Sequence, residues 1–269
     1  MYKDCHLHTT ISHDGQSSVW EYIAAAHEKH VDEILLTEHY DDYTGIDTEL
    51  HTLSVDAYAS EYRRIREKTD FPIGFGIEIG LRPECAEKTK QMAHLYSFDF
   101  IIGSSHITAG IDMAYDPSFF EGRTRRDAYL LYFSEVLKNV QIYDEFDVYG
   151  HLDYVARYGG YPGGRIRYAE FSDVFDEIFR TLIRKGKGIE INTSGLRYGL
   201  GSFCPGADLV KRYLDLGGEI ITLGSDARKA EDLAANFKEA SALLETLGVK
   251  FIAVFHARKP DFFPLSKLD

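Results

Sequence analysis

Short apolar runs rich in β-branched and aromatic residues alternate along this chain with longer amphipathic stretches. In residues 171–182 six apolar side chains recur at spacings of three and four, which is typical of a helix that buries one face. The strands that this pattern predicts are Lys3–His8, Glu33–His39, Ile73–Ile79, Phe98–His106, Asp147–Leu152, Gly188–Asn192, Glu219–Gly224 and Phe251–Phe255. The predicted helices are Ser18–His30, Val55–Lys68, Ala86–Tyr96, Arg125–Ile142, Tyr168–Lys185, Ala207–Leu216 and Leu233–Leu247.

Strand–helix alternation over the whole length favours a parallel α/β fold. The segments between the predicted elements are short and contain no hinge rich in proline and serine, so we expect a single domain over residues 1–269. The clearest loop is Gly159–Gly164, which contains four glycines and one proline.

Polar residues gather at one end of the predicted strands. At or just past the carboxyl ends lie His8, His39, Glu78, His106, His151, Asn192 and Asp226. Barrels and open α/β sheets build their sites at this end, so we expect these side chains to converge.

The first strand ends in DCHLHT, with His6 and His8 two residues apart. Residues at i and i+2 share one face of a strand, so we expect Cys5 and Leu7 to point the other way, toward covering helices. The pattern leaves two interpretations open, a pair of metal ligands or two histidines satisfied by hydrogen bonds.

The other strand ends carry a similar chemistry. Glu78 stands in an apolar strand, where a carboxylate is costly to bury without a partner, and His106, His151 and Asp226 each follow a strand and a glycine. One such residue is commonly structural, but the set together favours a metal site. Histidine and carboxylate donors without a thiolate suit Zn, Mn or Fe, and their number suggests two or three divalent ions. A carboxylate can bridge two ions that trap a hydroxide between them.

The amino-acid composition limits the classes of binding partner and the cellular compartment that we expect. The formal net charge of −13 argues against a nucleic-acid surface, although bound metal ions would still allow an anionic small substrate. Three cysteines without a CxxC pair favour a reduced, cytoplasmic protein. We expect no signal peptide, because no basic segment followed by an apolar one stands at the start, and no membrane partner, because no apolar run approaches membrane-spanning length.

The motifs HxHT, TEH, GxExG, GSxH, GHxD and GSDA follow in this order between His6 and Asp226. Together they resemble the polymerase and histidinol phosphatase (PHP) family. Two later stretches, EINTSGLR (Glu190–Arg197) and FIAVFHARKPDFFPL (Phe251–Leu265), look like its histidinol-phosphatase branch. The resemblance implies a distorted, TIM-barrel-like (β/α)7 barrel that carries a trinuclear metal centre.

The resemblance also implies a ligand set. The first ion would be held by His6, His8, Glu78 and Asp226, and a second by Glu78 as a bridge with His106 and His151. A third would use His39 and an acceptor from the first loop, where we favour Asp14 and His13 is a rival.

One position departs from the family pattern. The family commonly reads GSDAH, and its histidine helps to bind the third ion, whereas this chain has Arg228. A guanidinium stays protonated and cannot ligate a metal. The third ion therefore has fewer protein ligands, or the site holds two ions, or Arg228 contacts the phosphate.

The activity that the resemblance implies is hydrolysis of L-histidinol phosphate to L-histidinol and phosphate, a step of histidine biosynthesis. The hypothesised nucleophile is a hydroxide that bridges two ions and attacks phosphorus in line. Arginine suits phosphate because its fork donates two parallel hydrogen bonds, and the candidates are Arg197, Arg157, Arg165 and Arg228. The candidates for moving the proton are Asp226, His39 and Asp153.

The substrate also carries an ammonium and an imidazole. Acidic residues on loops after the site strands could meet them, namely Asp41, Asp42, Asp116 and Glu121. Three alternatives stay open: a PHP-type phosphatase or phosphodiesterase for another small ester, an amidohydrolase-type enzyme, and a metal-binding domain without catalysis.

Overall fold

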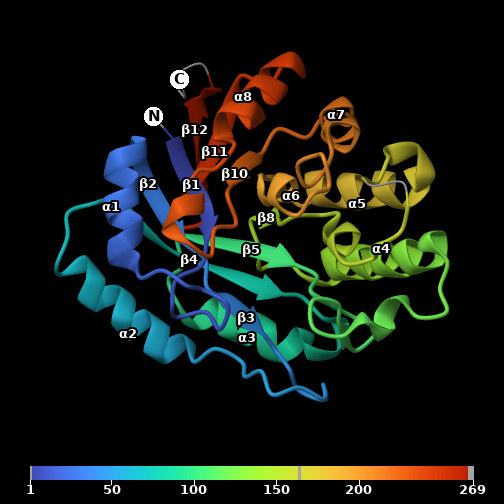
Figure 1. The fold of residues 1–269 in the computed structure, drawn as a ribbon, viewed down its shortest axis with the longest axis horizontal. Coiled ribbons are helices and arrows are strands. Elements are labelled where there is room, and N and C mark those ends of the chain that lie inside the picture. The colour runs from blue at the N-terminus through green and yellow to red at the C-terminus, as the bar shows by residue number, and fades with distance from the viewer. Residues whose placement is uncertain (1, 163–164, 266–269) are drawn as a thin grey trace.

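The computed structural model describes residues 2–162 and 165–265, so the last two residues of the predicted loop Gly159–Gly164 lie outside the described chain. Seven parallel strands form a nearly closed barrel (Figure 1). In spatial order they are β1 (Tyr2–Leu7), β2 (Val31–Leu36), β4 (Ile73–Gly80), β5 (Phe100–Ser104), β8 (Val148–Tyr149), β9 (Gly188–Asn192) and β10 (Ile221–Gly224). The predicted (β/α)7 barrel is confirmed.

The barrel closes between its first and last strands at the carboxyl end. His8 N donates to Ala227 O at 2.9 Å, and Asp226 N donates to His6 O at 2.7 Å. The short strand β3 (His39–Asp41) continues the course of β2 and pairs with β4, placing His39 opposite Glu78. The polar strand ends predicted from the sequence therefore meet at one rim.

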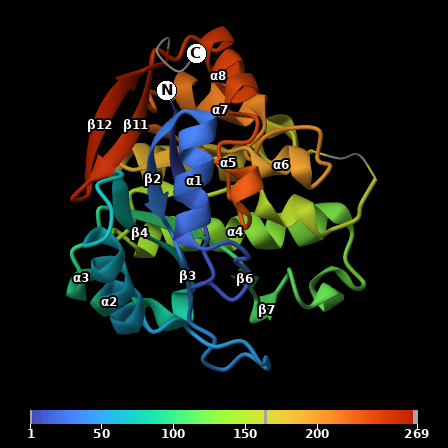
Figure 2. The same ribbon diagram turned by 60° about the vertical axis from the view of Figure 1, so that its left-hand side comes forward.

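Helices cover the outside of the barrel (Figures 1 and 2). They are α1 (Val19–Lys29), α2 (Val55–Arg66), α3 (Ala86–Leu95), α4 (Arg125–Ile142), α5 (Ser172–Arg184), α6 (Ser194–Arg197), α7 (Ala207–Asp215) and α8 (Phe237–Thr246). Short 3-10 turns occupy Pro83–Cys85, Pro117–Phe120, Tyr154–Arg157, Tyr168–Glu170 and Ala230–Asp232. On α5 the apolar residues Phe175, Ile178 and Leu182 are fully buried, as the helical spacing predicted. None of the helices in the described ranges combines the length and apolar character that crossing a membrane requires.

The core divides between the two faces of the strands. Leu7 packs in the large cluster between the barrel and the helices, whereas Cys5 packs with Leu35 and Phe100 in a smaller cluster on the inner face. The prediction that Cys5 would point toward the helices is therefore wrong. The register of β1 against β2 shifts between Asp4 and Leu7, which breaks the alternation of side chains.

The last predicted strand is also different from expectation. Phe251–His256 forms β11, which pairs with β12 (Lys259–Pro264) in an antiparallel hairpin instead of extending the parallel barrel (Figure 2). A second hairpin, β6 (Ile107–Thr108) with β7 (Ile111–Asp112), was not predicted, because two-residue strands carry no periodicity. The predicted strand at Asp147–Leu152 shortens to β8, because the chain leaves the ladder before His151, which has φ of 21°.

Candidate metal centre

Glu78 lies at the centre of the strand-end cluster and is fully buried. Its neighbours on β4, Ile77 and Ile79, belong to the core between barrel and helices, so alternation directs Glu78 into the barrel. A buried carboxylate requires compensation. Imidazole nitrogens approach it from His6, His8, His39, His106 and His151.

One donor group forms around Oε2 of Glu78. The Nε2 atoms of His6 and His8 lie 3.1 Å apart, and they lie 3.3 and 3.4 Å from this oxygen. Oδ1 of Asp226 lies 3.3 Å from His6 Nε2 and 3.5 Å from His8 Nε2. The four side chains predicted to hold the first ion thus converge on one point.

A second donor group forms around Oε1 of Glu78. This oxygen lies 2.8 Å from His151 Nε2 and 3.2 Å from His106 Nε2, and it accepts a 2.7 Å hydrogen bond from Ser104 Oγ. The two oxygens of Glu78 therefore face separate imidazole sets, which is the arrangement of a bridging carboxylate.

Two buried carboxylates whose role here the sequence analysis did not predict fix the ring orientations. Glu190 Oε1 lies 2.6 Å from His6 Nδ1, and Asp41 Oδ1 lies 2.9 Å from His106 Nδ1. Each contact leaves the Nε2 atom of its histidine directed at the centre. Carboxylates that orient histidine ligands in this way raise the basicity of the ligand. Asp41 was expected to meet the substrate, and with His39 and His106 it also forms one of the groups whose donor atoms are spaced to hold an ion.

Glycines make room for these carboxylates. A Cβ atom at Gly224 would lie 2.1 Å from Glu190 Oε1 and 2.5 Å from His6 Cβ. At Gly80 it would lie 1.9 Å from Asp41 Oδ1. Close approach of backbone to the buried groups thus requires glycine at both positions. The backbone at Asp226 is in the left-handed region, with φ of 55°, a strain that functional sites commonly hold.

The carboxylate at the centre is in the form that binds metals. Burial alone would raise the pKa of Glu78, but the nearby imidazoles of His6 and His106 hold it well below its usual range. Burial lowers the pKa of His8 and of His151, whereas neighbouring carboxylates raise the pKa of His6 and of His106 despite burial. Binding of a metal ion by His6 and His106 would therefore release protons.

The residues present fit divalent metal ions. In the described ranges, four overlapping groups of three side chains bring their donor atoms within 4.8 Å of one another. Among the same residues, Glu78 Oε2 is buried and has no hydrogen-bond partner, which is uncommon for a buried polar atom. Nitrogen and oxygen donors at this spacing can hold divalent ions.

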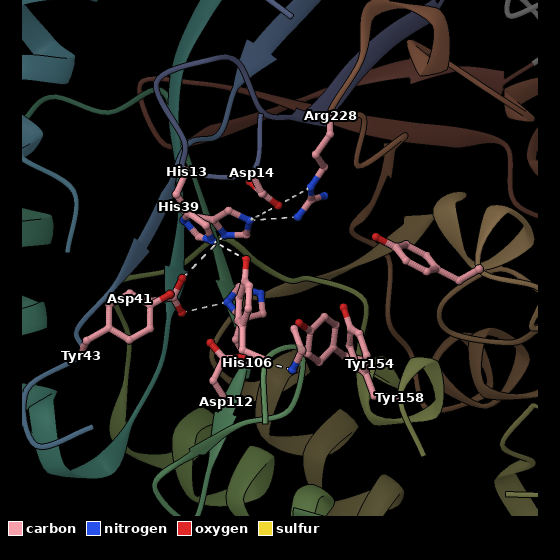
Figure 3. Close-up of a pocket in the computed structure, with 13 residues that line it drawn as sticks. His13, Asp14, His39, Asp41, Tyr43, His106, Asp112, Tyr154, Tyr158 and Arg228 are labelled. Atoms are coloured by element: carbon pink, nitrogen blue, oxygen red, sulfur yellow. Dashed lines mark hydrogen bonds and ion pairs between the residues drawn. The ribbon is translucent and has the colours of Figure 1, made fainter. Parts of the chain in front are cut away.

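The first loop and the GSDA segment meet beside this centre. Arg228 donates from Nε to Asp14 Oδ2 at 2.7 Å and from Nη2 to His39 Nε2 at 2.9 Å, as the dashed lines in Figure 3 show. Asp14 Oδ2 lies 3.5 Å from His39 Nε2. His13 is further out, where its Nε2 lies 2.8 Å from the hydroxyl of Tyr115. The His13 ring lies 5.5 Å from the His39 ring, so both residues are near His39 and the choice of Asp14 stays a prediction.

The predicted phosphate-binding arginines lie in different surroundings. The guanidinium of Arg157 is buried against Asp226, at 3.0 Å from Oδ2, and packs over the ring of Tyr198 at 4.7 Å. Its Nε is buried and has no hydrogen-bond partner within the described chain. Arg197 Nη2 donates to the carbonyl oxygens of Ser225 and Asp226 at 2.8 and 2.9 Å. Its role at phosphate stays a prediction, as does that of Arg165, which is exposed.

A polar pocket opens above the centre (Figure 3). Its wall is formed by His13, Asp14, His39, Asp41, Tyr43, His106, Asp112, Ala114, Tyr115, Tyr154, Tyr158, Tyr198 and Arg228. Asp153 does not line this pocket but is buried, and burial raises its pKa to about 6. Asp226 is likewise not part of the wall and belongs to the first donor group.

Asp112 is the pocket carboxylate that sequence reasoning missed. It is 7% exposed, and its Oδ1 accepts a 3.0 Å hydrogen bond from Ala114 N. Within the described ranges no lysine, arginine or histidine forms an ion pair with it. Burial and the charge of Asp41 raise its pKa to about 6. Of the acidic residues proposed to meet the substrate, Asp41 lines the pocket, whereas Asp42, Asp116 and Glu121 do not.

Sequence comparisons match this chain to a protein family and to relatives with one shared name. A family model described as the PHP domain matches residues 4–194. A probable histidinol-phosphatase of Clostridium acetobutylicum is 32% identical over 251 residues, covering 93% of this chain and 95% of that protein. A histidinol-phosphatase of Lactococcus lactis is 31% identical over 268 residues, covering 96% of each chain.

The fold also resembles that of a solved structure. A crystal structure of histidinol phosphate phosphatase from Lactococcus lactis, complexed with zinc, L-histidinol and phosphate, matches with a TM-score of 0.85. It is 30% identical in sequence, and the match covers 97% of this chain and 98% of that one.

Proposed function

The chain belongs to the PHP domain family, and from this premise we propose that it hydrolyses L-histidinol phosphate to L-histidinol and phosphate. The observation that carries the proposal is the convergence of His6, His8, Glu78 and Asp226 at one end of the barrel. The likeness over nearly the full length to an enzyme solved with zinc, L-histidinol and phosphate supports the substrate. The reaction class is phosphoric monoester hydrolysis, within histidine biosynthesis.

The metal sites follow the two donor groups. His6, His8, Glu78 and Asp226 would hold one divalent ion, and Glu78, His106 and His151 would hold another, each ion being zinc, manganese or iron. Bound ions of this kind lower the pKa of water and stabilise negative charge on phosphoryl oxygens.

The side chains around the donor groups would hold the phosphate. Arg157 offers its Nε, which has no hydrogen-bond partner among the described residues, and Arg228 lines the pocket wall. Guanidinium groups suit this role because they stay charged and donate in a fixed plane. His39 lines the pocket and Asp226 belongs to the centre, so either is placed to move a proton to the leaving oxygen. Asp153 is buried and does not line the pocket, and its role in proton transfer stays a prediction.

The pocket also offers a partner for the positive charge of histidinol. Asp112 is a nearly buried carboxylate on the pocket wall, next to the aromatic rings of Tyr43 and Tyr115. A substrate ammonium or imidazolium would compensate its charge, and tyrosine faces attract cations as well. We assign selection of the histidinol portion to this corner.

The state of the cysteines favours a protein that acts in a reducing compartment. Cys5, Cys85 and Cys204 are all free thiols. Free thiols in the fold are typical of proteins that act in the cytoplasm, where histidine biosynthesis would place this enzyme.

A substrate comparison tests the proposal. The value of kcat/KM would be measured for L-histidinol phosphate, for glycerol phosphate and for a phosphodiester, with the same metal-loaded protein. We expect L-histidinol phosphate to be preferred by at least about tenfold, since one charge-assisted contact is worth about 1.5–3 kcal/mol. Equal or higher activity on either of the other esters would favour the alternative, a PHP-type phosphatase or phosphodiesterase for a different metabolite.

A further inference from the structure

Arg228 occupies the space between three side chains that could otherwise bind a cation. Its Nε donates to Asp14 Oδ2 at 2.7 Å, and its Nη2 donates to His39 Nε2 at 2.9 Å. Its Nη1 donates to Asp226 Oδ1 and also to Asp226 O at 3.0 Å. The side chain is 18% exposed, so these contacts form at the edge of the pocket and not in open solvent.

The contact with His39 decides the state of that imidazole. A guanidinium has only donors, so His39 Nε2 must accept, and the remaining ring proton is on Nδ1. That Nδ1 lies 3.0 Å from Glu78 Oε2. His39 therefore has no free lone pair to offer an ion, although it lies within ligand distance of two of the donor groups.

Asp14 is committed to the same guanidinium. Among the residues that the structure describes, none of the groups spaced to hold a metal includes Asp14. The acceptor expected for a third ion thus already has a cation.

We propose that this protein holds two divalent ions, and that the Arg228 guanidinium permanently replaces the third cation implied by the family resemblance. This inference rests on the proposed function for the two ions, and it adds what stands in the third position. The charges agree with this arrangement, because two divalent ions leave one of the five carboxylates of Asp14, Asp41, Glu78, Glu190 and Asp226 unbalanced. Arg228 and Arg157 then give the site a surplus of one positive charge, which favours an anionic phosphate.

The guanidinium also retains a donor for the substrate. Of its five N–H groups, four are used by Asp14, Asp226 and His39, leaving one on Nη2. Because Arg228 lines the pocket, this N–H is available to a phosphoryl oxygen. The residue thus combines a fixed cation with a hydrogen-bond donor for phosphate.

Metal counting tests the inference without reference to activity. The full chain would be loaded with Mn²⁺ or with Zn²⁺, freed of excess metal by gel filtration, and measured by inductively coupled plasma mass spectrometry. We expect two ions per chain in the wild type and three in Arg228→His, because an imidazole supplies a lone pair and releases Asp14 and His39. The matched control is Arg212→His, which should keep two ions. This variant removes a different guanidinium, which is not part of the site and which donates to Asp176 at 2.5 and 2.8 Å.

The outcomes separate this inference from the proposed function. A wild-type count of three overturns the inference, as does a count of two in folded Arg228→His. If that variant does not fold, the wild-type count decides alone. A wild-type count below two overturns the inference together with the metal centre, whereas failure to hydrolyse L-histidinol phosphate at a count of two leaves the inference intact.

Discussion

The buried carboxylate of Glu190 accepts three hydrogen bonds, and replacing it with glutamine tests whether it tunes the metal centre. Oε1 is 2.6 Å from His6 Nδ1, and Oε2 accepts from His151 N at 2.9 Å and from Asn192 Nδ2 at 3.0 Å. Glutamine keeps the shape of the side chain but has one oxygen. Its NH2 group must therefore face either His6 or the two donors on the other side.

Either orientation weakens the site. If the NH2 group faces His6, Nδ1 becomes the acceptor and the ring proton moves to Nε2, which removes the lone pair that would bind the ion. If it faces His151 and Asn192, buried donors oppose each other, at a cost of about 1–3 kcal/mol in stability. Loss of such an orienting partner typically lowers metal affinity by about 10–100-fold. This corresponds to about 1.4–2.8 kcal/mol of binding free energy.

The assay is a competition titration in which a chromophoric chelator reports the Kd of the protein for Zn²⁺. The matched control is Glu170→Gln, which changes a partly exposed carboxylate paired with Arg125 away from the centre. We expect weaker metal binding in Glu190→Gln and an unchanged Kd in the control. A folded Glu190→Gln variant with wild-type affinity would refute the claim that Glu190 holds His6 in its ligating form.

Three further changes probe other parts of the structure. Asp112→Asn should raise KM for L-histidinol phosphate by about tenfold, because a charge-assisted contact is lost. Steady-state kinetics with glycerol phosphate should show no change in KM. Equal effects on both substrates would exclude a contact between Asp112 and the histidinol portion. Gly224→Ala should lower the free energy of unfolding measured in urea by about 1–3 kcal/mol, because its Cβ would lie 2.1 Å from Glu190 Oε1. A variant as stable as the wild type would show that the surrounding side chains can shift to accommodate the methyl group. His256→Gln addresses pH: His256 Nε2 lies 2.7 Å from Glu33 Oε1, and the hydrogen bonds of His256 raise its pKa above the ordinary value of 6.5 despite partial burial. The wild type should therefore exceed the variant in stability below pH 6.5, and the difference should disappear as the pH rises through the raised pKa of the folded state; a difference that grows with pH would contradict this sign.

The barrel and the centre were largely predictable because both depend on local patterns. Buried parallel strands are apolar runs, and their carboxyl ends meet at one rim, so a polar residue such as Glu78 or Asp226 at a strand end already indicates its neighbours. The side of Cys5 was not predictable, because a register shift in β1 depends on pairing with β2 and not on the β1 sequence. Nor could one apolar run reveal that β11 pairs antiparallel with β12.

The roles that the sequence analysis missed in the site depend on partners far away in the sequence. Glu190 orients His6 across 184 positions, and Asp41 orients His106 across 65 positions. A usable signal did exist for Glu190, since GIEIN places it between two isoleucines of a buried strand, as GIEIG places Glu78. The sequence around Asp112 carries no such signal. Its burial and its place on the pocket wall depend on the hairpin of β6 and β7, whose strands have only two residues each.

The most direct test of the central claim is phosphate release from L-histidinol phosphate. Zinc- or manganese-loaded protein would be compared with chelated protein, with His8→Ala and with His94→Ala, which changes an exposed histidine on α3. The account predicts release that disappears on chelation, falls by at least about 10³-fold in His8→Ala and is unchanged in His94→Ala. Release that survives chelation or the loss of His8, or metal-dependent release from other phosphoesters with none from L-histidinol phosphate, would contradict it.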